Sequence, residues 1–385
     1  MLGNFVVGTS VLAPAGMLQA LSGAFDVSVH EASLLITLGA VVLCLGTPVV
    51  SWATSRMDRR VLLGGSLLVL AAAQLASALT SSFAMLLVCR LVMLAAAAPF
   101  TPQAAGVVGL LVPVERRAST ISFIFLGWSL AAALGIPLVS MLADRTSWQI
   151  SYLTLAGLAL ASFALLVARL PSDLRTAPVD LGAWGALVRD ASVRRLLLLT
   201  VLLTAGQFSV FTFLGPLLAR LTHASPDAIG IAFALFGASG FVGNVLATRA
   251  VGSVGAFRTS LGAVLAMALG VAIWAIGAGS FAVMTLGLGV WGLGFASSNS
   301  MQQARLVATA PLHAGAAVAL NSSSLYVGQA LGSALGGMLF ARDLDRGLGY
   351  ASLAIMIAAL GVLLATRPRP AGRALDVAVA SARKA

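Results

Sequence analysis

Charged residues are scarce in this sequence. Asp, Glu, Lys and Arg account for 9% of its 385 residues, whereas apolar residues account for 59%. Because a water-soluble domain ordinarily carries about 25% charged residues, the composition excludes a soluble globular protein. It predicts a polytopic membrane protein whose solvent is the lipid bilayer.

Cysteine is also rare, and familiar catalytic patterns are missing. Cys44 and Cys89 both fall inside apolar runs, where we interpret them as small apolar fillers rather than as a disulfide or a metal pair. The sequence has no Gly-rich nucleotide-binding motif, no metal-ligand spacing of His, Cys or Asp, and no soluble region large enough for catalysis. We therefore expect no enzyme activity, no cofactor and no metal site.

What the sequence has instead is a series of apolar runs of bilayer length. A transmembrane helix needs about 20 apolar residues, and Gly, Pro or charged residues bound each run. We predict an all-α membrane protein with twelve transmembrane helices. The twelve runs are Leu2 to Ala24, Ala32 to Thr54, Val61 to Leu79, Phe83 to Val112, Ser119 to Ala143, Trp148 to Leu170, Leu196 to Leu221, Ala228 to Ala250, Thr259 to Ala278, Phe281 to Leu306, Ala314 to Ala341 and Leu348 to Thr366.

The distribution of basic residues predicts how these spans are oriented. Twelve spans put both termini on one side, and that side carries eighteen of the 23 Lys and Arg residues, whereas four lie on the other side and Arg90 lies within a span. Because cytoplasmic loops are enriched in Lys and Arg, both termini are predicted to be cytoplasmic. The net charge of +11 then favours anionic lipids as neighbours on the cytoplasmic side, and nucleic acid is disfavoured because no basic face recurs.

The two halves of the sequence repeat each other. When the chain is compared with itself at a shift of 197 residues, spans fall on spans and Gly135 falls on Gly332. Such a parallel repeat is typical of a transporter class whose substrate site lies between the halves. The predicted divisions are an N-terminal six-helix bundle at 1–170, a cytoplasmic linker at 171–195, a C-terminal six-helix bundle at 196–367 and a basic cytoplasmic tail at 368–385.

Several motifs, in this order, resemble those of the major facilitator superfamily, and within it the twelve-helix drug:proton antiporters and the arabinose, sugar and purine efflux permeases. SWATSRMDRRVLL at Ser51–Leu63 resembles the family's loop between helices two and three, and LLVCRLVMLAAAAP around Arg90 resembles its fourth-helix Arg motif. GWSLAAALGIP at Gly127–Pro137 resembles the fifth-helix antiporter motif, and LNSSSLYVGQALGSALGG ending at Gly337 resembles helix eleven. The resemblance implies the major facilitator fold and transport coupled to protons.

The loop motif implies a conformational latch. In the family this loop holds the two halves together on the cytoplasmic face through charge and helix-end contacts. Here Ser55 stands in place of the usual acid and Asp58 in place of the usual second Gly, so we expect a latch that is weaker or rewired through Asp58. The alternative is a loop that is merely positively charged. The residues assigned to the latch are Arg56, Asp58, Arg59 and Arg60.

Small residues in the fifth and eleventh helices are predicted to allow close packing. Gly127, Gly135 and Pro137 form the antiporter motif, and the three glycines spaced four residues apart in 328–336 let helix backbones approach. Ordinary membrane packing is one explanation of this pattern. The resemblance implies another, a gasket between the halves that limits proton leak.

Arg90 is the one formal charge placed well inside a span. A guanidinium at bilayer depth costs between roughly 3 and more than 10 kcal/mol, so its presence predicts a wet cavity or a polar partner. We interpret Arg90 as a substrate-binding or coupling residue that faces the cavity. The alternative is a structural arginine that hydrogen-bonds backbone carbonyls of a broken neighbouring helix.

Acidic residues are missing from the span cores, which limits the choices for proton coupling. A proton-coupled carrier usually needs a titratable group that sees each face of the membrane in turn. Only the edge acids Asp26 and Glu31, with His30 beside them, are available for this role. The alternatives are that these acids are solvated loop charges, that Arg90 couples protons indirectly, or that there is no coupling.

Polar and aromatic residues in mid-span supply a candidate binding site with otherwise apolar walls. Each of them alone is equally explained by an interhelical hydrogen bond or an interfacial anchor. With Arg90 as the only charge, such a cavity suits neutral or anionic amphiphilic solutes better than dications. The set is Arg90, Gln19, Trp128, Gln207, Phe211, Ser298, Asn299, Tyr326 and Gln329.

These features predict a multi-pass inner-membrane secondary transporter, acting as a monomer, that exports a small organic solute such as a drug, a sugar or a nucleoside. Transport occurs by alternating access, and the resemblance implies that protons move in exchange. One alternative is an uncoupled facilitator or importer of a small metabolite. An alternative from another class is a membrane receptor or scaffold without transport, which the repeat and the inward Arg90 disfavour.

Overall fold

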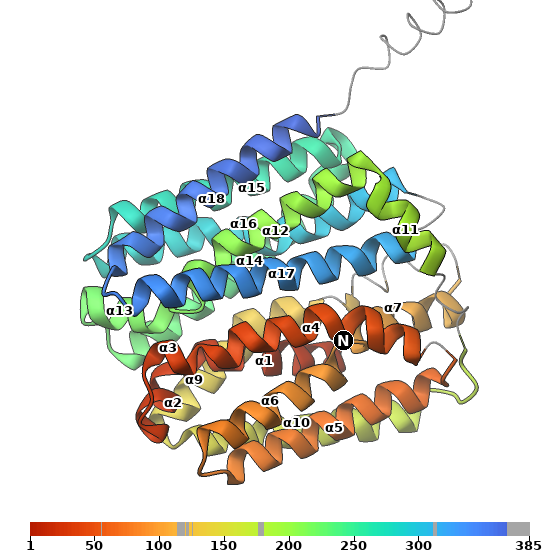
Figure 1. Cartoon of the computed structure of the whole chain (residues 1–385), viewed down its shortest axis with the longest axis horizontal. Helices are drawn as coiled ribbons and strands as arrows, with labels where there is room; N and C mark the ends of the chain where they lie inside the picture. Colours follow the sequence, from red (N-terminus) through yellow and green to blue (C-terminus); the bar gives the residue numbers. More distant parts are fainter. Residues whose placement is uncertain are drawn as a thin grey trace, which may run out of the picture.

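Helices are the regular elements throughout the described part of the chain. This is expected, because a backbone inside hydrocarbon must satisfy its own hydrogen bonds. Figure 1 shows two groups of helices, one from each half of the sequence. The predicted tail at 368–385 and part of the predicted linker lie outside the described residues. The structure, a computed structural model, describes residues 1–54, 56–113, 120, 123–124, 126–175, 181–310 and 314–367.

Each half contributes its own set of helices. The first half contains α1 (Leu2–Gly16), α2 (Leu18–Phe25), α3 (Val29–Ala32), α4 (Leu34–Ala53), α5 (Arg59–Leu79), α6 (Phe83–Ala97), α7 (Phe100–Leu111), the π-helix η1 (Ala131–Gly135), α9 (Ile136–Arg145) and α10 (Trp148–Arg169). The linker contains α11 (Leu181–Arg189). The second half contains α12 (Ala191–Phe211), α13 (Leu214–Thr222), α14 (Pro226–Val254), α15 (Ala256–Ile276), α16 (Phe281–Thr309), α17 (Ala314–Phe340) and α18 (Asp345–Ala365).

Membrane spans account for most of these helices. In the described residues ten helices are long and apolar enough to cross a bilayer, and the bent pair α1 and α2 makes eleven if it counts as one span. The remaining expected span corresponds to α17, which has 27 residues and carries Asn321, Tyr326 and Gln329. The bent first span and the less apolar α17 are thus the two expected spans that do not pass as single apolar helices.

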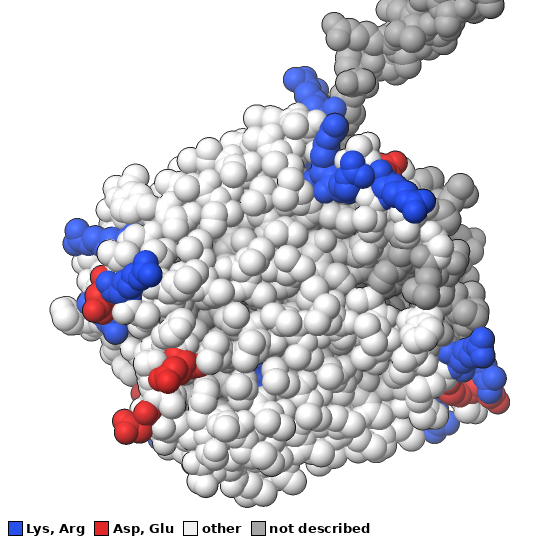
Figure 2. All heavy atoms as spheres, viewed as in Figure 1, with Lys and Arg blue, Asp and Glu red and all other residues white. Residues whose placement is uncertain are grey.

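The molecule presents an apolar belt. Figure 2 shows charged side chains gathered at two opposite ends, with an uncharged band between them. Large apolar side chains are exposed on the spans, such as Leu45 at 62% and Leu269 at 57%. Such exposure would be costly in water, whereas lipid tails cover it. The protein is a multi-pass membrane protein, as its composition predicts.

The helix boundaries confirm the predicted repeat. α5 begins at Arg59 and α15 begins at Ala256, 197 residues later. α10 begins at Trp148 and α18 at Asp345, again 197 residues later. Because different residues open these helices, the repeat is one of architecture more than of sequence.

Proline marks the places where spans break. The N–H that proline lacks cannot bond to the carbonyl four residues earlier, so the helix bends or ends. α1 contains Pro14, and the axis bends by 62° between α1 and α2. Pro99 separates α6 from α7, and Pro216 lies in the first turn of α13, just after the break from α12. These bends position the polar groups described below.

The glycines of α17 lie at packing positions. A Cβ atom added at Gly328, Gly332 or Gly336 would overlap a backbone oxygen of α12. α12 and α17 therefore lie in backbone contact along three turns. In a bilayer, the van der Waals packing of such a contact stabilises the association of the two helices.

Gly332→Ala should lower the free energy of unfolding by about 1–3 kcal/mol, because its methyl group has no space beside α12. The matched control is Gly262→Ala in α15, where a Cβ meets nothing within 4 Å. Thermal unfolding of the two purified variants in detergent compares them. Equal midpoints would contradict the close packing of α12 and α17.

Candidate functional site

The two halves of the chain meet at the end of the molecule that carries α2, α3 and α13, which we call the α13 end. Thr37 of α4 donates from Oγ1 to Oγ of Ser333 on α17, at 2.8 Å. Gly337, one turn further along α17, lies against the imidazole of His30. Apolar side chains from both halves, including Leu18 and Phe213, belong to one buried cluster. The halves are therefore packed together at the α13 end.

A close backbone contact between the halves involves Gly237 of α14. A Cβ at this position would overlap the backbone of Ala132 and Ala133 in η1. In this π-helix the Ile136 N–H bonds to the carbonyl of Ala131, five residues earlier, in place of the usual four. The extra residue per turn makes a bulge, and this bulge is what touches the other half.

The contact between the halves thus lies within the antiporter motif, but at Ala132 and Ala133 rather than at the motif's glycines. A Cβ at Gly135 would overlap the side chain of Thr9, and one at Gly127 would overlap the backbone at Met1 and Phe5. Both glycines thus pack against α1 of their own half. Pro137, which follows the bulge, is buried in α9. Within the motif, the two glycines allow a close contact with α1, and the η1 bulge supplies the contact between the halves.

Arg90 of α6 lies at the centre of the first half, where it is 3% exposed. Its guanidinium donates from Nη1 to the carbonyl of Ser10 and from Nη2 to that of Val11, at 2.6 Å. Nε donates to the carbonyl of Leu35 on α4, at 3.2 Å. The expectation that Arg90 faces a wet cavity is wrong for this conformation. The observed contacts match the alternative, an arginine held by carbonyls of a broken neighbouring helix.

Proline explains why α1 offers these carbonyls. In a regular helix the Ser10 carbonyl would accept the N–H of residue 14, but that residue is Pro14. Arg90 supplies the missing donor from the neighbouring helix. In hydrocarbon an unsatisfied carbonyl costs several kcal/mol, so a buried charge is tolerated here because it completes the hydrogen bonding of a bent span. Gln74 of α5 adds a bond to the hydroxyl of Ser10, at 2.9 Å.

A second polar chain lies nearer the N-terminus of α1. Trp128 donates from Nε1 to the hydroxyl of Thr101, at 3.1 Å, and that hydroxyl donates to the side-chain oxygen of Asn4, at 3.0 Å. Trp128 packs against an apolar cluster of the first half. Tyr326 of α17, from the second half, packs against the same cluster. Of the predicted set, Trp128 and Tyr326 are thus brought to one apolar cluster from opposite halves.

The second half has a polar chain of its own. Thr200 of α12 donates to the side-chain oxygen of Asn321, at 2.7 Å, and the amide of Asn321 donates to the oxygen of Asn299, at 3.2 Å. This chain joins α12, α17 and α16. Ser298 is buried and bonds within its own helix, to the carbonyl of Phe295. Asn299 is thus part of an interhelical hydrogen bond, which was the alternative to a ligand contact.

The remaining members of the predicted set are dispersed. Gln207 and Gln329 are buried, and the Oε1 of Gln207 has no partner among the described residues. Phe211 is completely buried and contacts the rings of Phe208, Phe233, Phe236 and Phe295. The expectation that Phe211 lines a cavity is therefore wrong here, because it is the centre of an aromatic core. Gln19 is exposed on α2, beyond the bend, so its predicted mid-span position is also wrong.

The edge acids have local structural roles. Glu31 accepts from the N–H and the hydroxyl of Ser28, both at 2.8 Å, and Ser28 accepts from the N–H of Glu31, which forms a capping box for α3. Asp26 is exposed and ends α2 in a left-handed conformation, with φ at 50°. His30, which lies between them in the chain, contacts Gly337 of the other half.

The loop assigned to the latch is anchored through Asp58. Its carboxylate caps α5 by accepting the N–H of Arg60 at 2.7 Å, and it also accepts the N–H of Asp173. Desolvation raises the pKa of Asp58, but these backbone hydrogen bonds outweigh it, so the pKa lies below its ordinary value. Arg60 donates to the carbonyl of Val167 at the end of α10, at 2.7 Å.

These latch contacts differ from the family's arrangement. Asp58 and Arg60 bind the end of α10 and the start of the linker, within the first half of the chain. Arg59 is buried and donates to the carbonyl of Thr54 at 3.1 Å, and Arg56 is exposed. In the described residues these bonds secure the linker to the first half. Ser55 lies outside the described residues.

Comparison with known proteins decides the family. The sequence model described as Major Facilitator Superfamily matches residues 1–222 and 196–382. The chain belongs to the Major Facilitator Superfamily. Members of this superfamily are membrane transporters, and the helix pattern and the repeat agree with that membership.

Relatives of this superfamily member include a transport protein and an antibiotic resistance protein. It is 28% identical to the inner membrane transport protein YdhP of Escherichia coli K12, over 94% of this chain and 93% of the relative. It is 30% identical to a chloramphenicol resistance protein of Streptomyces lividans, over 63% of each chain. Its fold is similar to that of a D-xylose-proton symporter, with a TM-score of 0.77, 16% identity and coverage of 95% of this chain and 96% of the other.

Sequence reasoning missed several polar residues of this superfamily member. Asn4, Thr101, Thr200 and Asn321 take part in the hydrogen-bonded chains but were not selected as candidates. A search for uncharged amides inside apolar runs would have found Asn4 and Asn321. Thr101 and Thr200 carry no such signal, because threonine often bonds within its own helix.

Arg90→Ala should destabilise the protein strongly, because each buried carbonyl left without a donor costs about 1–3 kcal/mol. Pro14→Ala should offset part of this loss, since the substituted residue brings a backbone N–H for the Ser10 carbonyl. A double-mutant cycle measured by thermal unfolding is therefore expected to show a coupling energy of about 1 kcal/mol or more. Pro48→Ala in α4 is the matched control and should be additive with Arg90→Ala. Additivity of both pairs would contradict the link between Arg90 and Pro14.

Asp58→Ala should destabilise the protein by about 0.5–2 kcal/mol near neutral pH, through loss of the α5 cap. Because the folded pKa lies below the unfolded value of 3.8, the carboxylate stabilises the fold above that value and loses this effect as the pH falls through the folded pKa. The difference between wild type and variant should thus shrink below about pH 4. Unfolding midpoints between pH 3 and pH 7 measure it, with the exposed Asp144→Ala as control. A constant difference across this range would contradict the role of the charge.

Proposed function

We propose that this superfamily member exports a small neutral or anionic amphiphilic solute across the inner membrane by alternating access, in exchange for protons. The observation that carries the proposal is that Trp128 and Tyr326 come from opposite halves and pack against one apolar cluster. Apolar walls with a few placed hydroxyl, amide and indole groups are typical of sites for such solutes.

The seal at the α13 end supports alternating access. Its polar contacts are a single hydroxyl pair and the ion pair of Arg145 with Asp227, whose side chains are 60% and 62% exposed. An exposed ion pair of this kind contributes about 0–1 kcal/mol, so few strong polar bonds have to break when the halves separate here. With both termini cytoplasmic, the α13 end faces outward, and the described conformation is one closed to the outside.

The charges of the buried region support the choice of solute. Among the described residues the buried charged side chains are Arg59, Arg90 and Arg305, and no acid is among them. A cation would find no counter-charge in such an interior and would pay its full desolvation cost. The chloramphenicol resistance relative fits this preference, because chloramphenicol is a neutral amphiphile.

His30 is our candidate for the exchanged proton. It is a titratable side chain of the α13 end that contacts the other half, and its Nδ1 is buried without a partner among the described residues. Asp26 and Glu31 are exposed beside it. Separation of the halves would open the imidazole to the outside, and closure would bury it against Gly337. This change of exposure would let the imidazole exchange a proton with the outer side only when the halves are apart.

In proteoliposomes loaded with chloramphenicol, an imposed pH gradient should drive solute release together with proton uptake. Trp128→Ala and Tyr326→Ala should each lower the initial rate about tenfold at subsaturating solute, corresponding to a loss of about 1.4 kcal/mol. Leu269→Ala, at an exposed apolar position, should leave the rate unchanged. His30→Gln should retain solute exchange and lose its dependence on the gradient.

The alternatives give different results in the same assay. A facilitator would exchange solute at a rate indifferent to the gradient, and a receptor or scaffold would show neither flux. Rates equal to wild type in both aromatic variants would remove Trp128 and Tyr326 from the site. Thermal unfolding of each variant checks that a lost rate does not reflect a lost fold.

A further inference from the structure

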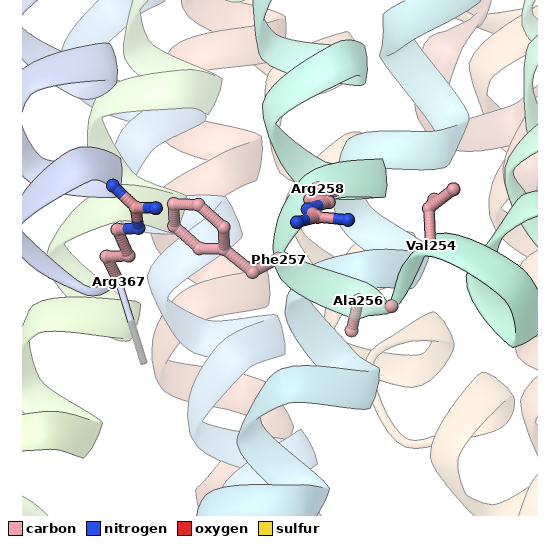
Figure 3. A pocket seen from close by; sticks show the side chains of 6 residues that line it. Val254, Ala256, Phe257, Arg258 and Arg367 are labelled. Atoms are coloured by element: carbon pink, nitrogen blue, oxygen red, sulfur yellow. The ribbon is translucent and has the colours of Figure 1, made fainter. Parts of the chain in front are cut away.

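A cavity opens at the end of the molecule opposite the α13 end, where the C-terminal end of α18 lies beside the junction of α14 and α15. Its volume is about 340 Å³. Figure 3 shows the side chains of Arg258 and Arg367 on either side of the Phe257 ring. The lining residues are Val254, Gly255, Ala256, Phe257, Arg258 and Arg367.

The cavity carries positive charge without a counter-charge. The side chains of Arg258 and Arg367 are exposed, and among the described residues neither forms an ion pair. All of its lining residues in the described part of the chain are basic or apolar, so no acid among them competes for the two guanidiniums. An anion that enters would therefore meet two arginines able to form charge-assisted hydrogen bonds.

The floor of the cavity is held in place by a buried arginine. The guanidinium of Arg305 lies 5.5 Å from the centre of the Phe257 ring, within reach of a cation–π interaction. Arg305 also donates to the carbonyl and the hydroxyl of Thr366, at 3.2 and 2.6 Å, at the end of α18. Phe257 and the end of α18 are thus connected through one side chain, which fixes the distance between the two sides of the cavity.

The cavity lies at the ends of two helices that are candidates to span the membrane. Arg258 lies in the first turn of α15 and Arg367 lies two residues beyond α18, and both helices are apolar enough to span a membrane. Below the cavity these helices expose Leu265 and Leu364. An amphiphile with its anionic group between the arginines would therefore have apolar surface beneath it for its acyl chains.

The repeat supplies an internal comparison. The equivalent cavity of the first half, about 460 Å³ in volume, is lined by Asp58, Arg60 and Val61 among others. At the shift of 197 residues, Arg258 replaces Val61 and Gly255 replaces Asp58. In the first half the carboxylate of Asp58 adds negative charge, and the guanidinium of Arg60 donates a hydrogen bond to the carbonyl of Val167. Of these two cavities, only the one in the second half thus has arginines and no acid among its described lining residues.

We propose that the cavity at Arg258 and Arg367 binds the phosphate headgroup of an anionic phospholipid. The two guanidiniums hold the phosphate, and the exposed faces of α15 and α18 contact the acyl chains. This site is separate from the seam between the halves, so the proposal does not depend on the solute that is transported.

Titration of the purified full-length protein with phosphatidylglycerol, followed by native mass spectrometry, tests the proposal. Arg258→Gln combined with Arg367→Gln should weaken one phosphatidylglycerol site about 30-fold, as two interfacial arginines are expected to do. Arg258→Lys combined with Arg367→Lys should retain most of the binding. Arg169→Gln combined with Arg189→Gln removes two exposed arginines elsewhere and should leave the site unchanged.

The outcomes separate the proposal from its alternatives. Equal loss in both Gln double variants would indicate general attraction by surface charge and overturn the site. Displacement of the lipid by an equal concentration of glycerol 3-phosphate would show that a soluble phosphate is the ligand, and would overturn it as well. Unfolding midpoints in phosphatidylcholine should be the same for wild type and variants, which shows that the arginines are not needed for folding. Unchanged phosphatidylglycerol binding in the Arg258 and Arg367 Gln variant would refute the proposal.

Discussion

Hydrocarbon offers a polypeptide backbone no hydrogen-bond partner, and the bent first span must therefore find its donors inside the protein. Pro14 removes the N–H that the Ser10 carbonyl would accept, and Arg90 supplies donors from α6 to Ser10 and Val11. The same guanidinium reaches Leu35 on α4. One side chain thus joins three helices and stabilises the bend that brings α2 to the α13 end.

The repeat allows one architectural position to serve two purposes. At the start of α5, Asp58 caps the helix and joins it to the linker, whereas at the start of α15 the equivalent residue is Gly255, which has a positive φ of 82° and no side chain. A carboxylate makes the first junction a structural contact. Its absence leaves the second junction open and basic, which is why the proposed lipid site is in one half only.

Small residues decide where the halves touch. The η1 bulge meets Gly237, and α17 meets α4 and α3 through Ser333 and Gly337. Contacts of this kind rely on shape and on few polar bonds, so they can form and separate as rigid units. The interior of each half is different, because chains such as Thr200, Asn321 and Asn299 join its helices by buried hydrogen bonds. This contrast agrees with the alternating access that we propose.

Much of this protein followed from its sequence alone. The helical class, the membrane environment, the repeat and the family were predictable because apolar length, glycine spacing and motif order are properties of local sequence. Gly332 was predicted to pack closely and does. By contrast, Arg90 faces carbonyls, Phe211 is a core residue and Gln19 is exposed, although all three were expected to line a cavity. Which neighbour a side chain meets depends on bends and rotations between helices some 80 residues apart, as for Arg90 and Ser10, and only packing in three dimensions decides those.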